Sequence, residues 1–169
     1  MPARPVVRYP APVLKTPAAE LQPGAEAEAL ARDLVDTMRA SPACVGIAAP
    51  QIGVGLQAFA MDVTGHKKAQ SCHGLLVMIN PVIVERIDDD ITREGCMSLP
   101  DFTGNVRRAR AVVVRGLTPD GTPIEIVADA FEARALQHEI DHLGGLLFLD
   151  RVASVHDVFR RKRYSDPRR

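Results

Sequence analysis

Apolar side chains recur at helical spacing in two segments of the chain. In the first, which follows a Pro-Gly pair and covers residues 24–40, they form one stripe along a predicted helix. The second extends from about Asp129 to Leu143 and is stopped by Gly144-Gly145, a pair typical of helix ends. A further helix is predicted to begin near Ser154.

Short runs rich in β-branched and aliphatic residues predict strands around these helices. One run is interrupted by Asn80-Pro81, and Asp120-Gly121 marks a hairpin turn. Because helices and strands do not alternate regularly, we expect an α+β fold with mostly antiparallel sheets around a central helix. No repeat or linker divides residues 1–169, so a single domain is expected. The predicted strands cover residues 56–62, 75–87, 91–99, 111–117 and 122–128.

The stretch 40–61 contains no charged residue. It is long enough to cross a bilayer, but prolines, glycines and glutamines interrupt it, which an apolar span rarely allows. We therefore expect no membrane segment and interpret the stretch as a buried loop followed by a core strand. Such a long uncharged loop is expected to line a site.

Composition narrows the class of protein. The 21 basic and 21 acidic residues balance, so the chain as a whole gives no argument for DNA or another polyanionic partner. The basic C-terminal tail, about 160–169, is interpreted either as a frayed end or as a transient contact with ribosomal RNA. Three cysteines are too few for a disulfide framework, and the N-terminus lacks the apolar core of a secretion signal. A bacterial-type cytoplasmic location is expected.

The second predicted helix carries the sequence His-Glu-x-x-His. His138 and His142 are four residues apart and therefore face the same side of a helix, where both imidazoles can reach one metal ion. Glu139 follows the first histidine and is suited to act as a general base. No residue downstream stands in a recognisable third-ligand context. Upstream, Cys96 is a candidate third ligand, although a lone cysteine is also often a small buried hydrophobe.

Three segments together resemble the peptide deformylase family. They are Gly46-Ile47-Ala48-Ala49-Pro50-Gln51, Glu94-Gly95-Cys96-Met97-Ser98 and His138-Glu139-Ile140-Asp141-His142. They occur in the family's order, and the resemblance extends over nearly the whole chain. It implies a metal-dependent hydrolase that removes the N-formyl group from the formyl-methionine of nascent polypeptides and releases formate.

The resemblance also implies roles for individual residues. Glu139 would accept a proton from water and pass it to the departing amine. The Gln51 side chain and the backbone N–H of Met97 would donate hydrogen bonds to the formyl oxygen. The implied metal ligands, with water in the fourth position, are Cys96, His138 and His142.

The same resemblance also implies a substrate site, whose residues are less precisely defined than the metal ligands. The peptide is expected to pair as an added strand beside Val45 and Gly46. Gly46 and Gly95 are expected either to let backbone approach the substrate closely or to be plain turn glycines. Phe131 and Ala135, with Val45, are expected walls of the methionine pocket, although a core role fits these three equally. Arg108 is expected at the surface, with a contact to a peptide carbonyl as the alternative.

The identity of the ion and two rival interpretations stay open. The resemblance implies one divalent ion per chain, Fe²⁺ in cells, with Zn²⁺, Ni²⁺ or Co²⁺ as substitutes. A generic zinc metallopeptidase would instead take a ligand downstream of His142. A structural site would need a fourth side chain, for which Cys44 is the candidate; it stands where the family's loop often has glycine. A monomer acting on N-formyl-methionyl peptides is expected.

Overall fold

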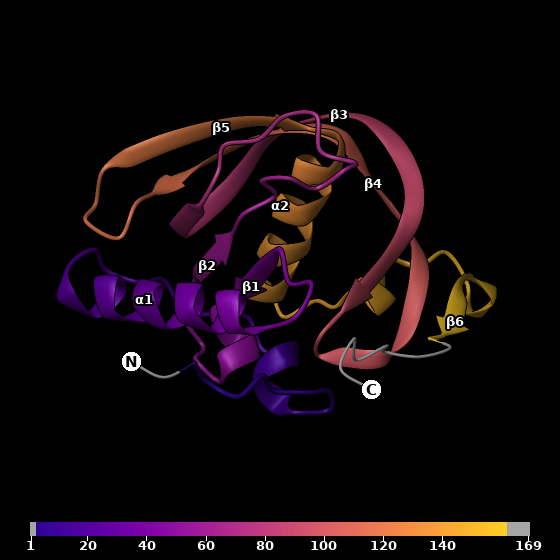
Figure 1. Cartoon of the computed structure of the whole chain (residues 1–169), viewed down its shortest axis with the longest axis horizontal. Helices are drawn as coiled ribbons and strands as arrows, with labels where there is room; N and C mark the ends of the chain where they lie inside the picture. Colours follow the sequence, from indigo (N-terminus) through magenta and orange to yellow (C-terminus); the bar gives the residue numbers. More distant parts are fainter. Residues whose placement is uncertain (1–2, 162–169) are drawn as a thin grey trace.

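The structure is a computed structural model that describes residues 3–161 of the chain. Long strands curve over one helix at the centre of the molecule, and another helix lies outside this arch (Figure 1). The helices are α1 (Ala25–Ala40) and α2 (Ala130–Leu143), and the strands are β1 (Gly46–Ala48), β2 (Ala58–Met61), β3 (Leu76–Cys96), β4 (Leu99–Leu117), β5 (Pro123–Asp129) and β6 (Val158–Arg160).

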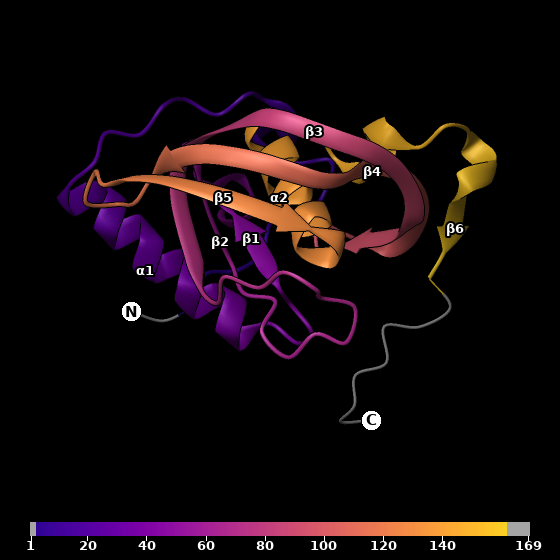
Figure 2. The ribbon, with the colours of Figure 1, turned by 90° about the horizontal axis from the view of Figure 1, so that it is seen from above.

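Each of these strands pairs with its neighbours in the antiparallel direction. The sheet order is β1-β2-β3-β4-β5, and β6 pairs with β4. Figure 2 shows β3, β4 and β5 lying across α2. The predicted α+β class, with a mostly antiparallel sheet around a central helix, is confirmed.

The central helix α2 agrees closely with the predicted segment. It begins after Asp129 and ends at Gly144. The following Gly145 has φ of 74°, and a Cβ there would lie 2.9 Å from the backbone of Lys15 and Thr16, so a glycine is required. Ten of the 14 residues of α2 are buried, so its polar side chains depend on partners from the protein or from a ligand.

The predicted breaks within the strands are wrong. The run at 75–87 and most of the run at 91–99 belong to one strand, β3, which ends at Cys96 and passes Asn80-Pro81 with a shift of register instead of ending there. The segment 111–117 is likewise only the last part of β4. Residues 84–91 are exposed, so no buried alternation marks them as strand; pairing with β4 satisfies their backbone instead.

The helix predicted near Ser154 is also wrong. Residues Val155–Asp157 form a 3-10 turn. The His156 N–H at its start donates to the Ser154 hydroxyl. The chain then enters β6, which pairs with β4 from Phe102 to Gly104. Of the basic tail at 160–169, all but its first two residues lies outside the described residues.

The uncharged stretch 40–61 forms β1, a 3-10 turn (Ala49–Ile52) and β2. Every residue of the turn and of β2 is buried, which confirms the core strand, whereas the loop is buried only in part because Pro42, Ala43, Gly53 and Gly55 are exposed. No helix among residues 3–161 is long and apolar enough to cross a membrane.

Three clusters of buried apolar side chains hold these elements together. The first fills the space between the sheet and α2 and includes Phe59, Val112 and Leu136. The second packs α1 against β1 and β2. The third surrounds Cys96 and includes Leu14 and Phe148. β2 contributes to the first two clusters, and the first cluster also contains residues of β3 and α2. Apolar burial on both sides of β2 therefore fixes the position of α2 relative to the end of β3.

Replacing Phe59 by alanine is expected to lower the free energy of unfolding by about 3–5 kcal/mol, because this fully buried ring leaves a cavity in the first cluster. Urea denaturation followed by circular dichroism measures the change. The exposed Val127→Ala on β5 is the control and should change stability by less than about 0.5 kcal/mol. Equal stability of the two variants would contradict this account of the core.

Candidate metal centre and active site

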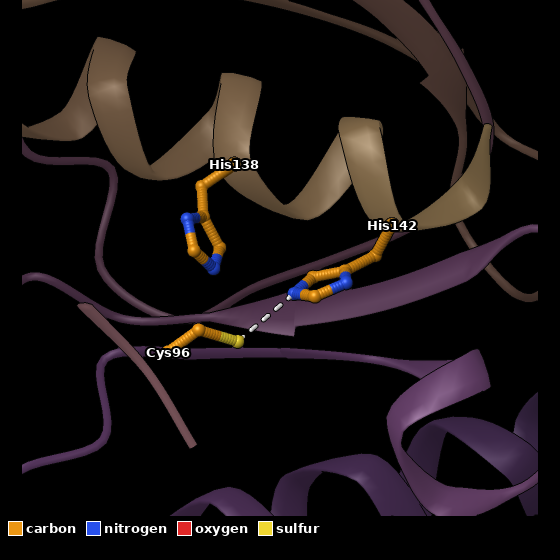
Figure 3. A group of neighbouring side chains, drawn as sticks. All are labelled: Cys96, His138 and His142. Carbon is orange, nitrogen blue, oxygen red and sulfur yellow. Dashed lines mark hydrogen bonds between the residues drawn. The ribbon is translucent and has the colours of Figure 1, made fainter. Parts of the chain in front are cut away.

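Two elements bring the three candidate metal ligands together. His138 and His142 extend from the same side of α2, and Cys96, at the end of β3, lies opposite them (Figure 3). The two imidazole centroids are 4.9 Å apart, and Cys96 Sγ is 3.4 Å from His142 Nε2. One ligand atom from each residue lies within 4.8 Å of the other two.

This donor set fits a divalent metal ion. Bonds of about 2.0–2.3 Å to one tetrahedral ion separate two donors by roughly 3.5 Å, so the observed spacing needs little adjustment. Among the described residues, the cluster contains neither Cys44 nor any residue downstream of His142. The Cys44 thiol instead donates to the Gly46 carbonyl at 3.1 Å. Three protein ligands with an open position are typical of a catalytic site.

The surroundings of Cys96 favour the thiolate. Burial alone would raise the pKa of this thiol, but the charge of His142 and a hydrogen bond from His138 hold the pKa well below its usual range. Gln51 Nε2 also donates toward Sγ at 3.5 Å. Loss of the thiol proton is what metal binding by cysteine requires.

A network of charged side chains orients His138. Its Nδ1 is 2.8 Å from a Glu94 carboxylate oxygen, which leaves Nε2 for a metal. Arg108 joins the network from β4: Nε donates to Glu94 at 2.7 Å and Nη1 donates to Asp141 at 2.7 Å. Arg151 Nη2 donates to the second Asp141 oxygen at 2.8 Å. The network therefore ties β3, β4 and α2 together behind the ligands.

The expectation that Arg108 lies at the surface is wrong. Its side chain is buried between two carboxylates, which compensate its charge. Burial would raise the pKa of Glu94, yet His138 and Arg108 lower it to about 2, so this carboxyl stays ionised. Sequence reasoning missed the role of Glu94. The only signal was its place two residues before Cys96.

Glu139 is buried beside the candidate ligands. Its Oε2 has no hydrogen-bond partner in the part of the chain that the structure describes, and burial raises its pKa. A carboxyl with a raised pKa is suited to take up and return a proton near neutral pH. Gly46 leaves room for it, because a Cβ at this position would lie 2.6 Å from Glu139 Oε1.

The Gln51 side chain is held in one orientation. Its Oε1 accepts a hydrogen bond from the Ala48 N–H at 3.0 Å, so Nε2 is turned toward Cys96 and lies 3.3 Å from the Ser98 hydroxyl. Met97 follows Cys96 directly and is half-buried at the turn between β3 and β4. The amide of Gln51 is thus preorganised close to the candidate metal ligands.

A cavity of about 820 Å³ opens onto Cys96, Glu139 and Gln51. Its walls come from the loop before β1, the end of β3 and the first half of α2. The residues predicted for the substrate site all line it: Val45, Gly46, Gly95, Phe131 and Ala135.

The loop before β3 contributes a wall that sequence reasoning missed. His66 stacks on Phe131 with ring centroids 3.7 Å apart and an interplanar angle of 5°. The buried Glu132 anchors this loop by accepting hydrogen bonds from the His73 N–H at 2.7 Å and the Ser71 hydroxyl at 2.8 Å. No local sequence motif predicts these contacts, because they join residues about 60 positions apart.

Replacing Arg108 by methionine is expected to lower the free energy of unfolding by about 3–5 kcal/mol, because two buried carboxylates lose their shared cation. The matched control is Arg115→Met, which removes an exposed ion pair with Glu125 and should cost less than about 1 kcal/mol. Urea denaturation of both variants provides the comparison. A small loss for Arg108→Met would show that the network contributes little to stability.

Comparison with known proteins agrees with this site. Residues 3–158 match the family model described as polypeptide deformylase. A peptide deformylase of Thermodesulfovibrio yellowstonii is 38% identical over 159 residues, which cover 93% of this chain and 94% of the relative. One from Syntrophobacter fumaroxidans is 41% identical over 93% of this chain and 91% of the relative. The crystal structure of a class I type b peptide deformylase from Acinetobacter baumannii superposes with a TM-score of 0.83 and 34% identity, covering 90% of this chain and 100% of that structure. The chain therefore belongs to the polypeptide deformylase family.

Proposed function

We propose that this protein is a metal-dependent peptide deformylase, which hydrolyses the N-formyl group of formyl-methionyl peptides and releases formate. Family membership supports the reaction. The observation that carries the assignment to this site is the cluster of Cys96, His138 and His142 beside the buried Glu139 in one cavity. A hydrolase needs these groups together: metal ligands, a proton acceptor and room for substrate.

Cys96, His138 and His142 would hold one divalent ion. Bound there, the ion supplies Lewis acidity, which acidifies water and polarises a carbonyl. From the family resemblance we propose Fe²⁺ as the ion in cells, with Zn²⁺, Ni²⁺ and Co²⁺ as substitutes; a thiolate with two imidazoles is a donor set that all of these borderline metals accept. Glu94 assists by accepting a hydrogen bond from His138 Nδ1–H, which keeps Nε2 free for the ion.

Glu139 is proposed as general base and then general acid. Its unpartnered Oε2 among the described residues gives it a free acceptor within the cavity. It takes a proton from the attacking water and returns it to the amine that leaves when the C–N bond breaks. Burial raises the pKa of Glu139, which makes it a better proton acceptor than a solvent-exposed carboxylate.

Gln51 and the backbone N–H of Met97 are proposed to stabilise the oxygen of the formyl group. Negative charge develops on that oxygen when water adds to the carbonyl. The Ala48 N–H already holds the Gln51 amide beside Cys96, so its Nε2 donor lies near the site before substrate binds.

Strand addition at β1 is proposed for the substrate peptide. β1 stands at the end of the sheet order, so one of its edges faces no other described strand. A peptide paired beside Val45 and Gly46 would place its first residue against Phe131 and Ala135. The tripeptide Met-Ala-Ser is bound in a crystal structure of the Acinetobacter baumannii enzyme, which supports this class of ligand. Action as a monomer and a ribosome contact through the tail at 160–169 remain predictions.

The first test measures formate release from formyl-Met-Ala-Ser by protein purified without oxygen and loaded with Fe²⁺ or Ni²⁺. Glu139→Ala is expected to lower kcat by about 10²–10⁴, because the proton acceptor is lost. Elemental analysis should still find one ion per chain in this variant. No formate release from the metal-loaded parent would refute the proposed function, and full activity of Glu139→Ala would refute the role of this residue.

Gln51→Met keeps the approximate size of the side chain but removes its donor. We expect kcat to fall by about 10²–10³ with metal content unchanged. Gln57→Met is the matched control, because Gln57 is a half-buried glutamine whose side-chain amide donates to the Ala18 carbonyl, away from the site. An equal effect of both substitutions would point to a loss of folding and not to a lost hydrogen bond.

A further inference from the structure

The wall of the cavity holds a cation that the proposed reaction does not use. Arg134 lies on α2 one helical turn before His138 and lines the cavity together with Phe131 and Ala135. Residues three and four apart share one face of a helix, so this face presents in sequence an aromatic ring, a guanidinium and a candidate metal ligand. Arg134 is 9% exposed.

Most hydrogen-bond donors of the Arg134 guanidinium have no acceptor among the described residues. Its Nη2 donates to the Val106 carbonyl at 2.8 Å. Its Nε and Nη1 are buried and have no hydrogen-bond partner among the described residues. Since Nε carries one N–H and Nη1 carries two, three of the five donors of this side chain lack an acceptor.

Arg108, the other buried arginine on this side of the sheet, differs in this respect. All three of its nitrogen atoms donate to the carboxylates of Glu94 or Asp141. No carboxylate forms an ion pair with Arg134 among the residues that the structure describes. Burial lowers the pKa of Arg134 accordingly. Buried donors without acceptors are unfavourable, so this position favours a ligand that brings an acceptor.

The place of Arg134 relative to the chemistry indicates which part of a ligand would meet it. Four residues of helix rise about 6 Å, so Arg134 lies about one extended side chain away from His138. A peptide whose formyl carbon is next to the metal cluster would direct its first side chain along this face of α2. This step rests on the proposed function.

We propose that Arg134 makes the first-residue pocket a binding site for side chains that carry an oxygen acceptor, with methionine sulfoxide as the best-fitting example. The thioether of methionine is a weak acceptor, and it leaves the donors of Arg134 unpaired. The sulfoxide has nearly the same shape and adds a strongly accepting oxygen. Because Nε and Nη1 are buried in the structure, binding in this mode would require a rotation about the terminal torsions of Arg134 that turns these donors into the cavity.

The test compares two peptides on the Ni²⁺-loaded protein. Calorimetry gives the affinities for Met-Ala-Ser and Met-sulfoxide-Ala-Ser, and formate release gives kcat/KM for their N-formyl forms. In Arg134→Met, the preference ratio of sulfoxide to thioether peptide is expected to fall about tenfold or more in both measurements, because a hydrogen bond to a charged donor is lost. A ratio within twofold of the parent's in folded Arg134→Met overturns the proposal.

Arg107→Met is the matched control. Arg107 is an exposed arginine of β4 whose loss removes the same charge close to the residue that Arg134 contacts, and the ratio should stay unchanged. Should Arg134→Met fail to fold, a crystal structure of the parent with Met-sulfoxide-Ala-Ser decides. The sulfoxide oxygen within about 3.2 Å of an Arg134 nitrogen supports the proposal, and its placement elsewhere overturns it. The binding arm requires no turnover, so absence of formate release would count against the proposed function alone.

Discussion

The geometry of the candidate metal site, formed by Cys96, His138 and His142, depends on one buried charge. Arg108 enters the interior from β4 and lies between the carboxylates of Glu94 on β3 and Asp141 on α2. It offsets part of the desolvation of both buried carboxylates, together with His138 at Glu94 and Arg151 at Asp141. Glu94 in turn orients His138. The relative placement of the strand that ends at Cys96 and the helix that carries the histidines is therefore an electrostatic property as well as a packing one.

The sequence was informative where function is encoded locally. The His-Glu-x-x-His pattern predicted α2 and the pairing of His138 with His142, because four-residue spacing on a helix leaves little freedom. The continuity of β3 and the path from Ser154 to β6 were not predictable, because both depend on pairing with β4. The burial of Arg108 was hidden for a similar reason, since its partners lie 14 and 33 positions away. Local patterns indicate elements, whereas compensation of charge is a property of the assembled fold.

The uncharged loop before β2 has a physical reason for its composition. Glu139 needs an unobstructed carboxylate, and Gly46 provides it by having no side chain. Burial and the nearby Glu139 raise the pKa of Cys44 to about 12, so this thiol stays neutral and adds no negative charge beside the carboxylate. A charged residue in the loop would compete with the groups that hold the ligands, and the loop therefore supplies amide and backbone donors instead.

The free edge of β1 has a consequence for the range of chains that such an enzyme can process. Main-chain N–H and C=O groups are common to every polypeptide, so an edge that pairs with them accepts a chain whatever its downstream side chains are. Selectivity would then be confined to the terminal residue, which in the proposed binding mode meets the part of the cavity between α2 and the loop that carries His66. Under the proposed binding mode, a strand edge that pairs with any backbone and a pocket for the terminal residue would together let one enzyme process peptides of many different sequences.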